Sequence, residues 1–161
     1  MNNKIKVKIT LILDNIRSSE NVGSIFRTAD AGGVERIYLI GITPNPVDRF
    51  GRLNPKINKA SLGAEKNILW EHFENIGDVI EKLKKDDYKI VSLEQNENSI
   101  DYRDLKIKEK IALIAGNEVS GISAETQKQS DEIIEIPMAG DKESLNVSVA
   151  TGIALFSILK K

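Results

Sequence analysis

Cysteine is absent from the 161-residue sequence, and histidine occurs once, at position 72. Without cysteine the chain can form neither a disulfide framework nor a thiolate nucleophile. With a single histidine, a metal centre built on cysteine and histidine ligands is not expected either, and we predict no metal. His72 lies in the run Trp70-Glu71-His72-Phe73, where we expect it to have a structural role.

Long apolar runs and a strong net charge are also missing. No stretch reaches the roughly 18 apolar residues typical of a membrane span, and no signal-peptide pattern is present, so we expect a soluble, cytoplasmic protein. The net charge is −1 and the pI is about 5.9, which argues mildly against a general nucleic-acid binder. The length suits a single domain, residues 1–161, that can bury a core.

Alternating hydrophobic patterns predict an α/β protein with a mostly parallel sheet and helices on both faces. No domain boundary, internal repeat or low-complexity segment interrupts this pattern. Strands are predicted at residues 9–13, 36–40, 68–70, 89–93, 111–115 and 133–136. Helices are predicted at residues 21–31, 55–61, 76–85, 124–129 and 146–160.

Polar side chains follow the first predicted strand on a helix that begins near residue 19. Asn21, Ser24 and Thr28 share one face of this helix, and Arg27 can point the same way. The buried side is supplied by Val22, Ile25, Phe26 and Ala29. Such a helix start suits a ligand, but a capped amphipathic helix with Arg27 in a surface ion pair would show the same spacing.

Two further strand ends carry polar groups. Gly116-Asn117-Glu118 follows the apolar strand 111–115, and Gly116 would allow either a close backbone approach or a positive φ. The strand 133–136 ends at Pro137, and Ser144 or Asn146 is suited to start the last helix. Open α/β sheets bind ligands outside the carboxyl ends of their strands, so these segments predict a common site.

Together these segments resemble the three motifs of the SpoU/TrmH-type RNA methyltransferases, in the SPOUT superfamily. The motifs are Asn21-x-Gly23-x-x-x-Arg27-x-Ala29, then Gly116-Asn117-Glu118 with Gly121, then Ile136-Pro137-Met138 followed by Ser144-Leu145-Asn146-Val147-Ser148-Val149-Ala150. Residues 59–64 and 92–99 also look familiar from that family. The resemblance covers nearly the whole chain and is to a minimal form without extension domains. Target choice is then expected to come from the core surface, a dimer or a separate partner.

The resemblance implies a C-terminal α/β trefoil knot, which general topology rules would not predict because true knots are close to absent among proteins. It also implies a homodimer. The last predicted helix is apolar nearly all round, so it must be covered on more than one side, and a partner subunit would cover it.

The implied reaction transfers a methyl group from S-adenosylmethionine to a ribose 2′-hydroxyl of RNA, either tRNA or rRNA, without a metal. By resemblance, Asn21 would order Arg27 and the substrate side, Ser144 and Asn146 would hold the loop and the hydroxyl, and Glu118 would contact the active-site loops. Apolar walls with main-chain hydrogen bonds suit an adenine ring. The adenosyl pocket would be lined by backbone groups around Leu93, Gly116, Ile136, Met138 and Leu145.

Arg27 has two possible roles. The family is usually given an arginine as general base, but a guanidinium is effectively always protonated and has no acceptor. Arg27 either binds the phosphate beside the target ribose or loses its proton because burial and other cations favour the neutral form. The sequence does not decide between these roles, and the first is preferred on physical grounds.

An RNA contact is predicted for Arg49, Arg52, Lys56 and Lys59, because no acidic residue separates them and Pro44, Pro46 and Gly51 mark their first part as loop. A solvated loop is the alternative. Two other functions remain open for the whole chain. One is a catalytically silent relative that binds RNA. The other is a nicotinamide-dependent oxidoreductase, although no Gly-x-Gly-x-x-Gly follows the first strand.

Overall fold

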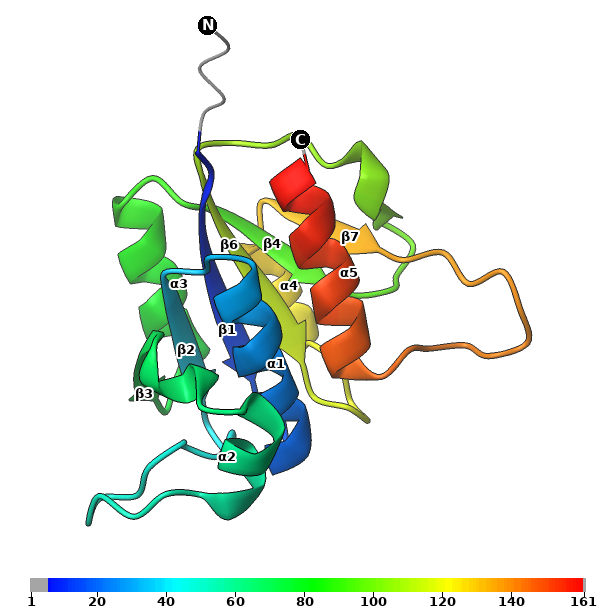
Figure 1. Ribbon diagram of the computed structural model, residues 1–161. Coiled ribbons are helices and arrows are strands. Elements are labelled where there is room, and N and C mark those ends of the chain that lie inside the picture. Colours follow the sequence, from blue (N-terminus) through cyan, green and yellow to red (C-terminus); the bar gives the residue numbers. More distant parts are fainter. Residues whose placement is uncertain (1–5, 161) are drawn as a thin grey trace, which may run out of the picture.

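The computed structural model describes residues 6–160, which form one seven-stranded sheet with the order β3-β2-β1-β6-β4-β7-β5 (Figure 1). All neighbouring strands in the sheet are parallel. The strands are β1 (Lys8–Asp14), β2 (Arg36–Ile40), β3 (Leu69–Phe73), β4 (Lys89–Leu93), β5 (Ile100–Asp101), β6 (Lys110–Gly116) and β7 (Glu132–Glu135). The helices are α1 (Ser19–Ala31), α2 (Pro55–Ser61), α3 (Ile76–Lys85), α4 (Ala124–Gln129) and α5 (Val147–Lys160), with short 3₁₀ turns at Ala64–Lys66 and Tyr102–Asp104.

Helices cover both faces of the sheet, as the alternating pattern predicted. One apolar core joins one face of the sheet to α1, α2 and α5, and a second core joins the other face to α3. The central strand β1 supplies both cores: Leu11 and Leu13 point to the first, and Ile12 to the second. This alternation is the period-two geometry of a strand buried on both faces.

The last strands of the chain lie inside the sheet rather than at its edges. β6 pairs with β1 on one side and β4 on the other, and β7 lies between β4 and β5. The chain then crosses back to α5, which packs beside α1 (Figure 1). This interleaving is consistent with the C-terminal knot that the resemblance implies, and it brings the ends of β4, β6 and β7 together.

The predicted elements differ from the observed ones mainly at the edges of the sheet. The third strand runs over Leu69–Phe73 rather than 68–70, because an edge strand with one paired side tolerates polar residues such as Glu71 and His72. Strand β5 was not predicted, since two residues are too few for a periodic signal. The Nδ1–H group of His72 donates a hydrogen bond of 2.7 Å to Oδ1 of Asn45, which fits the predicted structural role.

Candidate functional site

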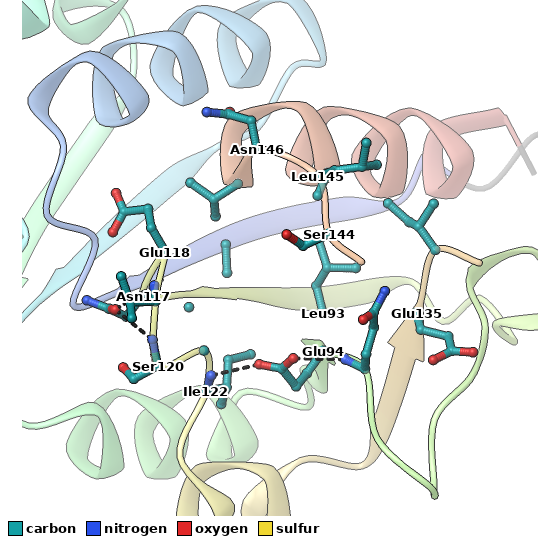
Figure 2. A pocket seen from close by; sticks show the side chains of 18 of the residues that line it. Leu93, Glu94, Asn117, Glu118, Ser120, Ile122, Glu135, Ser144, Leu145 and Asn146 are labelled. Carbon is teal, nitrogen blue, oxygen red and sulfur yellow. Dashed lines mark hydrogen bonds between the residues drawn. The ribbon is translucent and has the colours of Figure 1, made fainter. Parts of the chain in front are cut away.

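A cleft of about 700 Å³ opens at the carboxyl ends of β4, β6 and β7 (Figure 2). This volume is within the range of small-molecule and cofactor sites. Three segments that lie far apart in the sequence form it: the end of β4, the loop after β6, and the connection from β7 to α5. Its lining includes every residue predicted for the adenosyl pocket, namely Leu93, Gly116, Ile136, Met138 and Leu145.

The loop after β6 is shaped by a close backbone approach at Gly116. A Cβ atom there would lie 2.6 Å from Cγ1 of Ile122 and 2.7 Å from the carbonyl carbon of Gly121, so a side chain would push the loop away. Of the two possibilities stated for Gly116, close approach is the one observed, and the positive φ (67°) belongs to Gly121. The loop is also closed by Asn117, whose Oδ1 accepts hydrogen bonds from the amides of Val119 (2.9 Å) and Ser120 (3.0 Å).

Glu94 holds the far end of the same loop. Its Oε2 accepts a hydrogen bond of 2.8 Å from the Ile122 amide, and Oε1 accepts one of 2.9 Å from the Gln95 amide (Figure 2). A Cβ atom at Gly121 would collide with this carboxylate, so the glycine and the glutamate fit each other. The sequence prediction missed Glu94, although it lies in the stretch 92–99 that looks familiar from the family.

Glu118 joins the loop after β6 to the start of α1. Its Oε2 accepts a hydrogen bond from the Arg17 amide (2.9 Å), and its Oε1 accepts one from the Ser18 amide (3.0 Å). The same Oε1 accepts a third from Nδ2 of Asn21 (3.1 Å). Loss of hydration at the carboxylate opposes ionisation of Glu118, but these hydrogen bonds outweigh that effect and lower the pKa of the carboxyl below its ordinary value. Glu118 is therefore a charged acceptor that fixes the first turn of α1.

Asn146 completes the connection between the three motifs. Its Nδ2 donates a hydrogen bond of 3.0 Å to Oδ1 of Asn21, and its Oδ1 accepts one of 2.9 Å from the Ser148 amide, which caps the start of α5. A chain of polar contacts thus runs from Glu118 through Asn21 to Asn146. Ser144, Asn146 and Glu118 also line the cleft, so four of the five residues predicted as catalytic lie in or beside it.

Arg27 is the fifth, and it lies apart from these four. Its side chain is exposed on α1, does not line the cleft, and makes no hydrogen bond or ion pair within residues 6–160. Asn21 contacts Glu118 and Asn146 rather than Arg27. The helical repeat explains the separation. Arg27 follows Asn21 by six residues, so the two side chains point about 120° apart around the helix axis.

Two of the four predicted RNA-binding cations lie close to acidic side chains in the folded protein. Nε of Arg52 lies 2.7 Å from Oδ2 of Asp48, and Nζ of Lys56 lies 3.6 Å from Oε1 of Glu20. Hydrogen bonds from the Arg52 amide and guanidinium, against a smaller opposing effect of desolvation, lower the pKa of Asp48. The stretch is therefore acid-free only along the chain. Arg49 and Lys59 are exposed and form no ion pair within the part of the chain that the structure describes.

Among residues 6–160, no group of histidine, aspartate and glutamate side chains has a metal-binding arrangement. The described helices include none with the length and apolar character that a membrane crossing requires.

The chain is similar to known proteins over nearly its whole length. Residues 8–156 match the model of the SpoU rRNA Methylase family, a range that contains the three motifs and the whole cleft. The chain belongs to this family. A TrmH-family protein of Staphylococcus saprophyticus is 36% identical over 97% of the chain.

Solved structures of other proteins share the fold. An AdoMet-bound rRNA methyltransferase from Sinorhizobium meliloti superposes with a TM-score of 0.86 at 30% identity, over 95% of this chain and 56% of that one. The TrmH/SpoU tRNA modifying enzyme of A. aeolicus gives a TM-score of 0.82 at 28% identity, over 97% of this chain and 77% of that one. The chain spans 60% of the length of the staphylococcal relative.

Proposed function

We propose that this protein transfers a methyl group from S-adenosylmethionine to a ribose 2′-hydroxyl of tRNA or rRNA. The observation that carries the proposal is the polar chain Glu118–Asn21–Asn146, which joins one residue from each of the three family motifs beside a single cleft. The S. meliloti neighbour, which holds AdoMet, supports the choice of donor.

The cleft has the chemistry that such a donor requires. Leu93, Ile136 and Leu145 give apolar surface for an adenine ring. The lining also includes Glu94, Glu118 and Glu135, and its described residues include no lysine, arginine or histidine. A cleft that is negatively charged and partly apolar favours S-adenosylmethionine, which combines an adenine ring with a net positive charge. It disfavours an anion such as NAD, which argues against the oxidoreductase alternative.

The donor supplies an electrophilic methyl carbon, so the protein must position the hydroxyl and assist the loss of its proton. Ser144 and Asn146 line the cleft where the connection from β7 reaches α5 (Figure 2), and are suited to hold the hydroxyl and the loop. Arg27 is exposed, and an exposed guanidinium suits a phosphate of the substrate better than the role of a base.

A homodimer built on α5 is part of the proposal. Thr151, Ala154, Leu155 and Ile158 face the interior, whereas the other side of the helix leaves apolar side chains in solvent. These are Val149, Ile153, Phe156 and Leu159, each between 37% and 50% exposed. A contiguous apolar stripe on one helix is the kind of surface that a second subunit covers.

Calorimetric titration tests the donor site directly. The wild-type protein is expected to bind S-adenosylmethionine with micromolar affinity, about −8 kcal/mol, and NAD not at all. Leu145→Arg should abolish binding, because a long cation would occupy the apolar wall. Leu69→Arg is the matched control, since Leu69 is exposed on β3 outside the cleft. Folded wild-type protein that releases no binding heat at high donor concentration would contradict the proposal.

Methyl transfer separates an enzyme from a silent relative. Tritiated donor should label total tRNA or rRNA, and the label should survive base removal and map to a 2′-O-methyl nucleotide. Donor binding without transfer to either RNA would favour the catalytically silent alternative.

A further inference from the structure

The connection from β2 to α2 ends in an ordered hairpin that projects from the body of the molecule beside α2 (Figure 1). An antiparallel bridge joins Val47 to Leu53 and closes it. Oδ1 of Asp48 accepts hydrogen bonds from the amides of Phe50 (2.8 Å) and Arg52 (3.0 Å), and the Gly51 amide donates to the Asp48 carbonyl (3.0 Å). The tip, residues 48–52, therefore has a defined shape.

Phe50 lies at this tip with 67% of its surface exposed. The guanidinium carbon of Arg49 lies 4.8 Å from the centre of the Phe50 ring, and that of Arg52 lies 5.1 Å from it. A single exposed apolar residue needs no explanation, but an aromatic ring with two guanidinium groups close to it on an ordered turn is a specific arrangement. Aromatic rings and guanidinium planes are the surfaces on which unpaired nucleic-acid bases stack.

The hairpin is fastened to the same helix end that forms the candidate site. Nδ2 of Asn54 donates a hydrogen bond of 3.2 Å to Oγ of Ser19, and Lys56 pairs with Glu20. Ser19 and Glu20 directly precede Asn21, which contacts Glu118 and Asn146. The base of the hairpin is thus attached to the helix end beside the cleft, as a contact for a neighbouring nucleotide requires.

The charges at the tip favour a base over a phosphate. Asp48 pairs with Arg52, so the net positive charge of residues 48–52 is that of one arginine rather than two. A phosphate clamp would be weakened by this carboxylate, whereas stacking depends on planar surfaces and is little affected by it. We propose that Phe50, with Arg49 and Arg52, forms a stacking site for an unpaired RNA base, a recognition site that rests on the proposed RNA methyltransferase function.

The test compares single-stranded and duplex RNA. The probes are a fluorescein-labelled adenosine dodecamer and the same strand annealed to its uridine complement, measured by anisotropy with S-adenosylmethionine present. Phe50→Ala should weaken binding of the single strand by about 5- to 150-fold, the usual effect of removing one stacked base contact. Binding of the duplex should change less than about twofold, because its bases are already stacked. Phe50→Tyr should bind like the wild type.

Two controls separate stacking from charge and from loss of structure. Ile42→Ala removes another exposed apolar side chain of the same connection and should leave both affinities unchanged. The slope of log affinity against log salt should be the same for Phe50→Ala and wild type, because the phenyl ring neutralises no phosphate. In Phe50→Trp, the added tryptophan fluorescence should be quenched by the single strand but not by the duplex.

The stacking site would be overturned if Phe50→Ala bound the single strand as tightly as the wild type, or if it lost the same affinity for both probes. A wild-type protein that binds neither probe would also overturn it. The donor titration with Leu145→Arg is independent of the tip, so a failure here leaves the proposed methyltransferase function separately testable.

Discussion

Removing the charge of Glu118 should loosen the start of α1, because this carboxylate is the acceptor that ties the first turn of the helix to the loop after β6. The change is Glu118→Gln, which keeps the size of the side chain. The amide retains one oxygen acceptor but places an NH₂ group against donors, namely the amides of Arg17 and Ser18 and the side chain of Asn21. At least one donor then loses its partner.

The size of the effect follows from these contacts. A hydrogen bond to a charged group contributes about 1.5–3 kcal/mol in general, but Glu118 is exposed, and its donors can turn to water. We therefore expect a loss of about 1–2 kcal/mol in the free energy of unfolding at pH 7. For a domain of this size that lowers Tm by about 2–8 °C.

The pH dependence gives a sharper signature. The folded-state pKa of Glu118 is lowered, whereas the unfolded chain titrates near the ordinary value of 4.5. The unfolded state therefore binds the proton first as pH falls, so the stabilisation is fully present above about pH 4.5 and is lost as pH falls through the lower, folded pKa. The stability difference between wild type and Glu118→Gln should shrink over this acidic window.

Denaturant unfolding between pH 7 and pH 3 measures both effects. Glu97→Gln is the matched control, since Glu97 is exposed and its carboxylate accepts no hydrogen bond within residues 6–160. Equal unfolding free energies for wild type and Glu118→Gln at pH 7 would refute the proposed role of the carboxylate. A difference that persists unchanged at pH 3 would show that it does not arise from the ionised carboxylate.

The remaining predictions concern Arg27 and α5. Arg27→Ala should change donor affinity by no more than a few-fold but lower the rate of methyl transfer by about 100-fold or more, as expected when a positioned catalytic group is lost. Arg27→Lys should restore little of this rate, because lysine lacks the planar fork of the guanidinium. A wild-type transfer rate in Arg27→Ala would show that Arg27 is only a surface cation. Phe156→Glu should give monomers or insoluble protein by light scattering, and a stable wild-type monomer of 17.9 kDa at micromolar concentration would contradict the α5 dimer.

Much of the fold could be predicted because periodic burial dominates the sequence. Five-residue apolar runs such as 111–115 are buried on both faces, and they were recognised as strands for that reason. The predicted bounds of α2, α3 and α4 are those observed, since Pro55 starts one helix and Asn75 and Ser123 cap the other two. β5 was not predicted, because these two residues form a strand only through their pairing with β7.

The candidate site divides in the same way. Its location could be predicted, because strand ends of a parallel sheet meet at one edge and polar residues followed the ends of β1, β6 and β7. The contacts within it could not. Asn21 contacts Glu118 and Asn146, which lie 97 and 125 residues away in the sequence. Asp48, which pairs with Arg52, lies just outside the stretch that has no acidic residue.

Gly23 shows how a family motif can combine two physical requirements. A Cβ atom at this position would lie 2.6 Å from the carbonyl oxygen of Ile57 and 2.7 Å from Cβ of Ala60, so only glycine lets α1 and α2 pack this closely. α2 follows the hairpin that carries Phe50, and α1 carries Asn21, which contacts the cleft residues Glu118 and Asn146. We therefore expect Gly23→Ala to push α2 away from α1 and to displace the hairpin relative to the cleft, although the glycine itself contacts neither proposed site.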